Sequence, residues 1–253
     1  MNRAGVGLVV VASLVSVTGC AVSVAARSTP SASTTASRPA DGVISSAIPV
    51  PHPSASNVPA SWWPKRTGNV VYLTFDDGPW PTTHEVLDIL RDNGAHATFF
   101  QIGSLVDDYG SITQRIIAEG HAIGNHTYDH VYMNKLSDDL VRYQLEKTWR
   151  TIGYDVQGPC VRPPFGAAGP KQRQIAVDMG LTPVFWTIDT RDWANPPEDS
   201  IYKQIVSAKP GSIVLMHDGG GDRTKTIAAL RRALPVLKKR GYVFNTVPVC
   251  VRH

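Results

Sequence analysis

The sequence predicts an α/β domain with a mostly parallel sheet, and three features of the chain carry this prediction. From residue 69 onward, apolar runs of strand length alternate with amphipathic stretches of helical length. Helix-capping residues and glycines mark the ends of the helical stretches. Polar residues follow several of the apolar runs, and in a parallel sheet those positions share one edge. This periodicity fits an open doubly wound sheet and an incomplete barrel equally well.

Six apolar runs predict the strands of the sheet. They cover residues 69–75, 97–102, 122–124, 183–188, 212–216 and 242–247. Helices are predicted between them, and the first begins with the capping-box spacing of Thr82 and Glu85 and ends before Gly94. The other helices cover residues 104–119, 137–153, 170–179, 200–208 and 224–240. Pro170 at a helix start and basic residues in the last turns of the final helix are typical of helix ends.

Composition and charge narrow the class of protein. The chain has 253 residues, of which 42% are hydrophobic and 18% charged, so it has enough apolar material for one large core. Lys and Arg number 25 against 21 Asp and Glu, which gives a formal charge of +4 without any long block of basic residues. This distribution argues against a nucleic-acid partner, and no obligate protein partner is evident.

The N-terminal region predicts export. Residues 1–19 have the layout of a secretory signal, with Arg3 before a short apolar core, and the pattern that ends at Cys20 resembles a bacterial lipoprotein signal. We therefore expect Cys20 to carry a lipid that anchors the protein to the outer face of the cytoplasmic membrane. The alternative is an ordinary signal peptide cut near residues 25–26, which would give a secreted protein.

Residues 20–65 are expected to form a flexible tether. Their segment 21–60 is rich in Ala, Ser, Thr and Pro and contains no Leu, Phe, Tyr or Trp. The folded domain then covers residues 66–253, in which Cys160 and Cys250 are the only cysteines. Export permits a disulfide between them, and two buried thiols are the alternative.

Polar residues follow four of the predicted strands. They are Asp76 and Asp77, Asn125 and His126, Asp189, and His217 and Asp218. Because the carboxyl ends of parallel strands lie at one edge, these groups are expected to converge in one site. Each also has an ordinary alternative, since Asp-Asp-Gly-Pro is a turn sequence and a histidine at a buried strand end can belong to the core.

His126 and His130 stand at i and i+4, which would place both imidazoles one helical turn apart and within reach of one ion. This spacing alone occurs often by chance. A carboxylate from Asp76 or Asp77 would complete a three-ligand set that leaves a position open for water and suits catalytic zinc. The two adjacent aspartates cannot point the same way, so one is expected to ligate and the other to handle a proton.

Five ordered motifs resemble those of the NodB-type polysaccharide deacetylases, carbohydrate esterase family 4. They are Thr74-Phe75-Asp76-Asp77-Gly78-Pro79, His126-Thr127-Tyr128-Asp129-His130, Arg162-Pro163-Pro164-Phe165-Gly166, Asp189-Thr190-Arg191-Asp192-Trp193 and Ile213-Val214-Leu215-Met216-His217-Asp218. The resemblance covers residues 69–247, nearly the whole predicted domain. It implies a distorted, incomplete (β/α) barrel, which chooses between the two architectures that periodicity leaves open.

By this resemblance, Asp77, His126 and His130 bind one divalent metal ion, most often zinc, and cobalt also suits these donors. Asp76 is the implied general base, which takes a proton from the attacking water while the ion polarises the acetyl carbonyl. Arg162 is implied to pair with Asp76 and to fix its orientation, a bidentate task for which lysine is a poor substitute.

The resemblance also implies an acid and a binding pocket. His217 is the implied general acid, and Asp192 beside it would favour the cationic imidazole that this role needs. The backbone N–H of Phe165 is implied to hold the tetrahedral oxyanion. Trp193 and Leu215 would form the walls of the pocket that accepts the acetyl methyl group.

The implied reaction is metal-dependent removal of acetyl groups from N-acetylglucosamine-containing polysaccharide, either peptidoglycan or a chitin-like glycan. A membrane tether favours peptidoglycan, because the tethered enzyme meets the wall first. The alternatives are an O-acetyl esterase on acetylated xylan, which similar proteins provide with the same motifs, and a glycan- or metal-binding module without turnover. The candidate sugar-contacting residues are His84, Tyr128, Tyr132, Trp186 and the 194–199 loop, each of which could equally serve packing or a solvated loop.

Overall fold

The computed structural model describes residues 68–251. Its strands are β1 (Val70–Gly78), β2 (Ala97–Gln101), β3 (Ala122–Asn125), β4 (Cys160–Val161), β5 (Thr182–Pro183), β6 (Ile188–Asp189), β7 (Ile213–His217) and β8 (Val243–Phe244). Its α-helices are α1 (Thr83–Asp92), α2 (Gly103–Ala118), α3 (Asp138–Ile152), α4 (Pro170–Asp178), α5 (Glu198–Val206) and α6 (Thr224–Lys239). Short 3₁₀ helices cover η3 (Met133–Lys135), η4 (Pro164–Gly166), η5 (Asp192–Ala194) and η6 (Pro248–Cys250).

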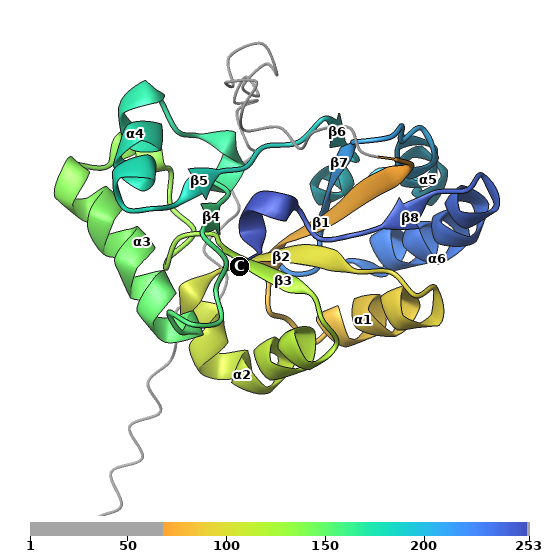
Figure 1. Ribbon diagram of the computed structural model, residues 1–253, viewed down its shortest axis with the longest axis horizontal. Helices are drawn as coiled ribbons and strands as arrows, with labels where there is room; N and C mark the ends of the chain where they lie inside the picture. The colour runs from red at the N-terminus through yellow and green to blue at the C-terminus, as the bar shows by residue number, and fades with distance from the viewer. Residues whose placement is uncertain (1–67, 252–253) are drawn as a thin grey trace, which may run out of the picture. The chain divides into compact units, whose positions relative to one another are not determined.

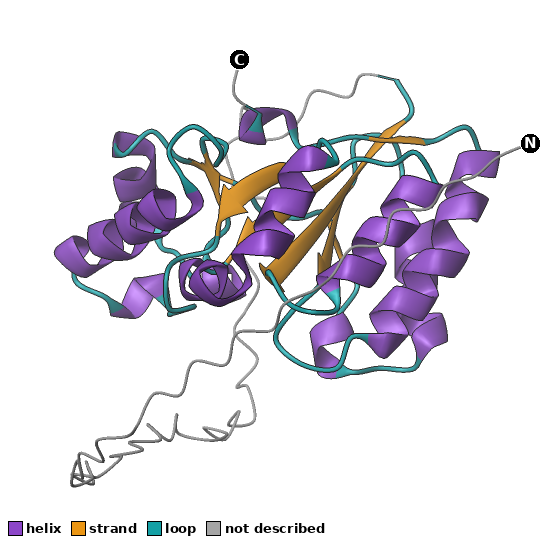
Figure 2. Cartoon of the chain, turned by 90° about the horizontal axis from the view of Figure 1, so that it is seen from below, coloured by secondary structure: helices purple, strands orange, loops and turns teal. Residues whose placement is uncertain are grey.

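The strands form one curled parallel sheet with helices on its outer side (Figure 1). The order across the sheet is β5-β4-β3-β2-β1-β7-β6, and β8 pairs with the start of β1. No ladder joins β5 to β6, so the described strands form a barrel that is open on one side. The prediction of an incomplete (β/α) barrel is therefore confirmed. Figure 2 shows the helices gathered around the strands from a second direction.

The alternation of side chains in β1 separates the core from the site. Val71, Leu73 and Phe75 face outward and belong to the large apolar cluster under α1, α2, α5 and α6. Thr74 and Asp76 point to the concave side. The same alternation holds in β7. Val214 and Met216 belong to the outer cluster, whereas His217 ends the inner row. Because successive side chains of a strand point to opposite faces, these strands place polar groups on the inner side of the sheet and apolar groups on the outer side.

The predicted strand over residues 183–188 is wrong in its middle. The structure divides it into β5, which pairs with β4, and β6, which pairs with β7. Residues 184–187 cross from one edge of the sheet to the other. There the Val184 N–H still donates to Val161 of β4 and the Thr187 N–H to Ile213 of β7, but no strand ladder of the described chain includes Phe185 and Trp186. Part of the missing hydrogen bonding is replaced by a side chain, because the Arg162 guanidinium donates to the carbonyl oxygens of Val184 (3.3 Å) and Phe185 (3.1 Å).

Other element predictions need smaller corrections. Thr82 does not cap α1 with its side chain, since its hydroxyl donates instead to the carbonyl oxygen of Asp218 at 2.6 Å. Helix α5 begins directly after Pro197, two residues before the predicted start at Ser200. The last strand is shorter than predicted, and β4 was not predicted because two residues carry no readable periodicity.

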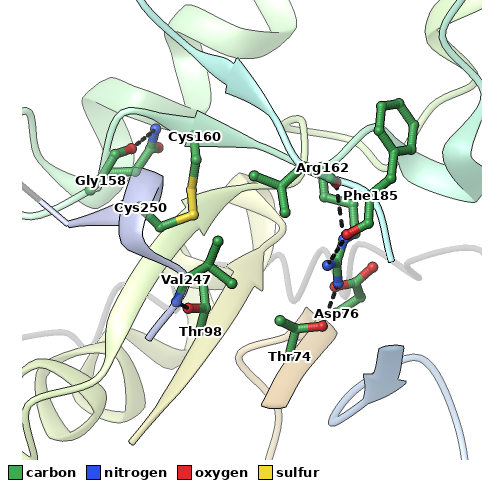
Figure 3. Close-up of a disulfide and its surroundings, with 11 residues drawn as sticks. Thr74, Asp76, Thr98, Gly158, Cys160, Arg162, Phe185, Val247 and Cys250 are labelled. Atoms are coloured by element: carbon green, nitrogen blue, oxygen red, sulfur yellow. Dashed lines mark hydrogen bonds and ion pairs between the residues drawn. A yellow bond between two sulfur atoms is a disulfide. The ribbon is translucent and has the colours of Figure 1, made fainter. Parts of the chain in front are cut away.

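A disulfide joins Cys160 in β4 to Cys250 in η6, 90 residues later (Figure 3). Both cysteines are buried in the inner apolar cluster. The C-terminal segment is thereby held against the strand that leads into Arg162. Gly158 is required beside this bridge, because a Cβ at this position would overlap the carbonyl of Cys250.

Several sequence predictions fall outside the described residues. These are the signal over residues 1–19, lipidation at Cys20 and the tether over residues 20–65. Within residues 68–251, no helix combines the length and the apolar character that crossing a membrane requires.

Candidate active site

Three potential metal ligands converge at the carboxyl ends of β1 and β3. One ligand atom from each of Asp77, His126 and His130 lies within 4.8 Å of the other two. Asp77 Oδ1 lies 3.4 Å from His126 Nε2 and 3.1 Å from His130 Nε2. The structure therefore brings together the set that the sequence singled out, with an aspartate from one strand end and two histidines from another.

Hydrogen bonding fixes which nitrogen of His126 faces this cluster. Its Nδ1 lies 2.6 Å from the carbonyl oxygen of Arg162. A carbonyl only accepts, so Nδ1 carries the proton and donates, and Nε2 presents a lone pair toward Asp77. A backbone carbonyl in this position is the usual orienting partner of a metal-binding imidazole.

The two histidines are not on a helix, which corrects the expectation of one helical turn. Residues 126–130 form a loop in which Thr127 (φ 62°) and His130 (φ 52°) adopt left-handed backbone conformations. Gln144 of α3 holds this loop, because its Oε1 accepts from the backbone N–H groups of Tyr128 and Asp129 at 2.9 Å each. The i, i+4 spacing correctly indicated that the two imidazoles lie close together, but the backbone that brings them together is irregular.

The donor set fits a divalent cation. Asp77 Oδ1 is buried, and no hydrogen bond reaches it from residues 68–251. Burial opposes the charged form of Asp77, but the imidazoles of His130 and His126 hold its pKa well below the usual range. Two neutral nitrogens and one carboxylate are a common catalytic zinc set. A bound ion would polarise a substrate carbonyl and favour ionisation of water.

Asp76 lies next to this cluster and is paired with Arg162. Arg162 Nη1 donates to Asp76 Oδ1 at 2.8 Å, and the other carboxylate oxygen lies 3.8 Å from His126 Nε2. The same Nη1 donates to the hydroxyl of Thr74 at 2.8 Å (Figure 3). Arg162 has no exposed surface, and its planar group rests 4.2 Å from the ring of Phe100. This confinement fixes one oxygen of Asp76 and leaves the other directed toward the metal ligands.

His217 stands at the carboxyl end of β7. It is the register partner of Asp76 across β1 and β7, so the two groups stand on neighbouring strand ends. Its Nδ1 donates to Asp192 Oδ1 at 2.7 Å, while Asp192 Oδ2 accepts from the His217 backbone N–H at 2.8 Å and from Thr226 at 2.9 Å. This arrangement leaves Nε2 as the ring nitrogen that can transfer a proton to a ligand.

Electrostatics favour a charged His217–Asp192 pair. Burial opposes charging of His217, and the Asp192 carboxylate outweighs it, so the pKa of His217 is raised to about 9. Burial likewise opposes ionisation of Asp192, but the nearby His217 and Arg223 charges lower its pKa. At neutral pH the imidazole is therefore protonated, which is the form that a general acid needs.

Phe165 and Trp193 are two exposed aromatic side chains in the motifs that also carry the site residues. Phe165, in a left-handed conformation within η4, is 39% exposed and its ring centroid lies 4.6 Å from that of His130. Tyr132 stacks on Phe165 at 4.0 Å with an interplanar angle of 12°. Trp193 is also 39% exposed, while Leu215 is buried in the inner row of β7 that ends at His217.

Sequence reasoning missed the residues that support this machinery. Thr74, Gln144 and Thr226 each bind a site residue, and Thr83 donates to Asp218 directly after His217. The signal was weak, because threonine and glutamine at these positions also suit a strand or a helix surface. Only their burial shows that their polar atoms need partners.

Comparisons with known proteins agree with this geometry. Residues 64–184 match the family model of polysaccharide deacetylases. A peptidoglycan-N-acetylglucosamine deacetylase of Bacillus cereus is 41% identical over 198 residues, covering 76% of this chain and 93% of the relative. A chitooligosaccharide deacetylase of Azorhizobium caulinodans is 38% identical over 194 residues, covering 70% and 92%. The crystal structure of the Bc1960 peptidoglycan N-acetylglucosamine deacetylase, 34% identical, gives a TM-score of 0.69 over 74% of this chain and 89% of that chain.

Proposed function

Since this chain belongs to the polysaccharide deacetylase family, we propose that it is a metal-dependent hydrolase that removes acetyl groups from N-acetylglucosamine residues of a polysaccharide. The observation that carries the proposal is the arrangement of three polar groups around one point. The Asp77–His126–His130 cluster lies beside the Arg162-paired carboxylate of Asp76, and the register partner of Asp76 on β7 is His217, which is paired with buried Asp192. Hydrolysis of an amide needs a base, an acid and a means to stabilise an oxyanion, and this site offers all three.

Asp76 is suited to the role of base. Its Oδ1 is held by Arg162, so the second oxygen can accept a proton from a water molecule beside the metal ligands. The guanidinium keeps the carboxylate oriented and compensates its charge in a buried setting. Loss of the base would therefore remove water activation while leaving the Asp77, His126 and His130 ligands in place.

His217 is suited to the role of acid. The leaving group of this reaction is a sugar amine, which is a poor leaving group until it receives a proton. The cationic imidazole can supply that proton from Nε2, and Asp192 stabilises the charge and fixes the ring through Nδ1. Asp76 and His217 are thus suited to act on the same carbonyl from neighbouring strands.

The remaining predicted residues are assigned to binding. We assign the backbone N–H of Phe165 to the tetrahedral oxyanion, and Trp193 and Leu215 to the pocket for the acetyl methyl. The exposed faces and edges of Phe165 and Trp193 suit contact with sugar rings, since sugars pack against aromatic side chains. Zinc is the metal that the donor set suits best, with cobalt as an alternative.

The cellular setting is proposed from the N-terminal sequence. Lipidation at Cys20 and a tether over residues 20–65 would hold the domain at the outer face of the cytoplasmic membrane. The wall polymer would then be within reach, which favours peptidoglycan as the substrate over a chitin-like glycan. An unlipidated, secreted form is the alternative.

The experiment is acetate release by the domain from residue 61 on N-acetylglucosamine oligomers, peptidoglycan and acetylated xylan, with and without chelator. We expect release from the N-acetylated substrates that stops on chelation and returns with zinc. Asp76→Ala and His126→Ala should both abolish release, with circular dichroism as the control for folding. Release that persists in both folded variants would refute the proposal.

The same assay separates the alternatives. Release from xylan alone would make the protein an O-acetyl esterase with the same residues in the same roles. Metal binding without acetate release from any of the three substrates would indicate a binding module.

A further inference from the structure

The metal ligand Asp77 sits in a backbone conformation that an aspartate rarely adopts. Its φ is 70°, in the left-handed region, and the pairing of β1 with β2 shifts register between Asp76 and Gly78. Asp77 is therefore the extra residue of a bulge, and a bulge re-aims a side chain away from the strand alternation. A left-handed backbone is unfavourable for a residue other than glycine, so neighbouring groups must hold it.

Asp218 holds the chain on both sides of this bulge. Its backbone N–H donates to the carbonyl oxygen of Asp76 at 3.1 Å, just before Asp77. Its own carbonyl oxygen accepts from the hydroxyl of Thr82 at 2.6 Å, and its Oδ2 accepts from the hydroxyl of Thr83 at 2.5 Å, both beyond the bulge. One fully buried residue thus fastens the start and the end of the turn between β1 and α1.

Close packing confirms that the bulge is enclosed. A Cβ on Gly78 would overlap the Asp218 carboxylate. A Cβ on Gly219 would overlap the carbonyl oxygen of Asp77, and one on Gly220 would lie 2.8 Å from Asp77 Oδ2. The 218–220 segment therefore forms a cradle around Asp77 that has no space for larger residues.

We propose that Asp218, together with Thr82 and Thr83, is a positioning unit that holds Asp77 in the left-handed bulge and thereby sets the affinity of the site for a divalent metal ion. This inference rests on the proposed function, because it takes Asp77, His126 and His130 as the metal ligands. Asp218 itself is not a ligand in this arrangement. Its carboxylate faces Thr83 and Gly78.

The test compares Thr83→Val with Thr83→Ser. Valine removes the hydroxyl that Asp218 accepts from and keeps the shape, whereas serine keeps the hydroxyl and is the matched control. Zinc binding is measured by competition with a chromophoric chelator, and the melting temperature of each metal-free protein is recorded separately. We expect zinc affinity to fall about tenfold or more in the valine variant, as for other residues that orient metal ligands, and to stay within about twofold of wild type in the serine variant.

The readouts distinguish positioning from simple stability. A lower melting temperature of the metal-free valine variant with wild-type zinc affinity would overturn the inference, because the hydroxyl would then serve the fold alone. If Thr83→Val does not fold, Thr82→Val against Thr82→Ser decides the same question through the other hydroxyl. Failure of the wild-type protein to bind zinc or cobalt would overturn the proposed function together with this inference, whereas binding that is equal in all folded variants would overturn the inference alone.

Discussion

Replacement of Asp192 by asparagine should change the charge of His217 without removing the side chain that packs against it. In the native site, one Asp192 oxygen accepts from His217 Nδ1 and the other accepts from the His217 backbone and from Thr226. Asparagine can keep its oxygen on the backbone N–H and Thr226. Its amide then donates toward Nδ1, which favours the neutral imidazole with the proton on Nε2.

The size of the effect follows from the pKa of His217, about 9 in the native protein. Without the Asp192 carboxylate, burial still lowers the pKa of the imidazole and the Asp77 and Asp76 charges still raise it, so the pKa should fall to about 6.5. The difference corresponds to about 3 kcal/mol, from 2.5 × 1.36 kcal/mol. At pH 7 the cationic fraction falls from about 99% to about one quarter or less, so the population of competent acid drops at least about fourfold.

The direct assay is an NMR titration of the labelled histidine side chains in the metal-free protein, because a bound cation would itself lower the pKa. The chain has 8 histidines, and His217→Gln identifies the resonance. The kinetic assay is kcat/KM against pH with zinc present. The deficit of Asp192→Asn should shrink as the pH falls from 7 to 5.5, because acidification restores the cationic imidazole.

Stability gives an independent check with a definite sign. The folded-state pKa of His217 lies above its unfolded value of 6.5, so the pair stabilises the fold fully below that pH and loses its effect as the pH rises through about 9. In Asp192→Asn this loss between pH 6.5 and 9 should disappear from the melting curves. Thr226→Val, which removes one hydrogen bond and no charge, is the control. A His217 resonance that still titrates near 9 in Asp192→Asn would refute the assignment of the shift to this pair.

Three further predictions concern stability and substrate contact. Arg162→Met should lower the free energy of unfolding, measured by urea denaturation, by about 3–5 kcal/mol, because it leaves the buried Asp76 without its partner. A loss below about 1 kcal/mol would contradict this. Cys160→Ala should lower the free energy of unfolding by about 2–5 kcal/mol in the same measurement, since the disulfide to Cys250 spans a sequence separation of 90. Equal stability of the reduced and oxidised wild-type protein would contradict this. Tyr132→Ala should raise KM for N-acetylglucosamine oligomers several-fold, whereas Tyr132→Phe should leave KM unchanged because the ring stack persists; equal KM values would exclude a binding role.

Much of the fold was readable because long periodic elements dominate it. The helices α2 and α3 lie within one residue of their predicted bounds, and polar residues at the carboxyl ends of β1, β3 and β7 meet as a parallel sheet requires. The architecture could not be predicted in the same way, because the alternation of strands and helices does not determine whether the sheet closes into a barrel. Only the resemblance of the five motifs favoured the incomplete barrel.

The failures have a common physical cause, which is side-chain hydrogen bonding to irregular backbone. The predicted strand over residues 183–188 breaks where the Arg162 guanidinium binds two carbonyls, and the His126–His130 loop departs from a helix where Gln144 binds two N–H groups. Thr82 faces Asp218 and not its own helix. Each contact joins residues at least 15 positions apart, which is beyond the window that a helical or strand period covers.

The role of Arg162 links the open barrel to the chemistry. A closed barrel would satisfy the backbone between β5 and β6 with a neighbouring strand, but here a guanidinium partly does so while also holding Asp76. Lysine could not reproduce this, because an ammonium lacks the planar fork that serves several acceptors at fixed angles. An inactive Arg162 variant would therefore reflect both a loosened barrel edge and a misplaced base. Asp76→Asn separates the two, because its amide oxygen can still accept from Arg162 while the Val184 and Phe185 carbonyls stay bound. Stability should fall, since the buried guanidinium loses its counter-charge, but full loss of acetate release with the fold retained by circular dichroism would assign the chemistry to Asp76 itself.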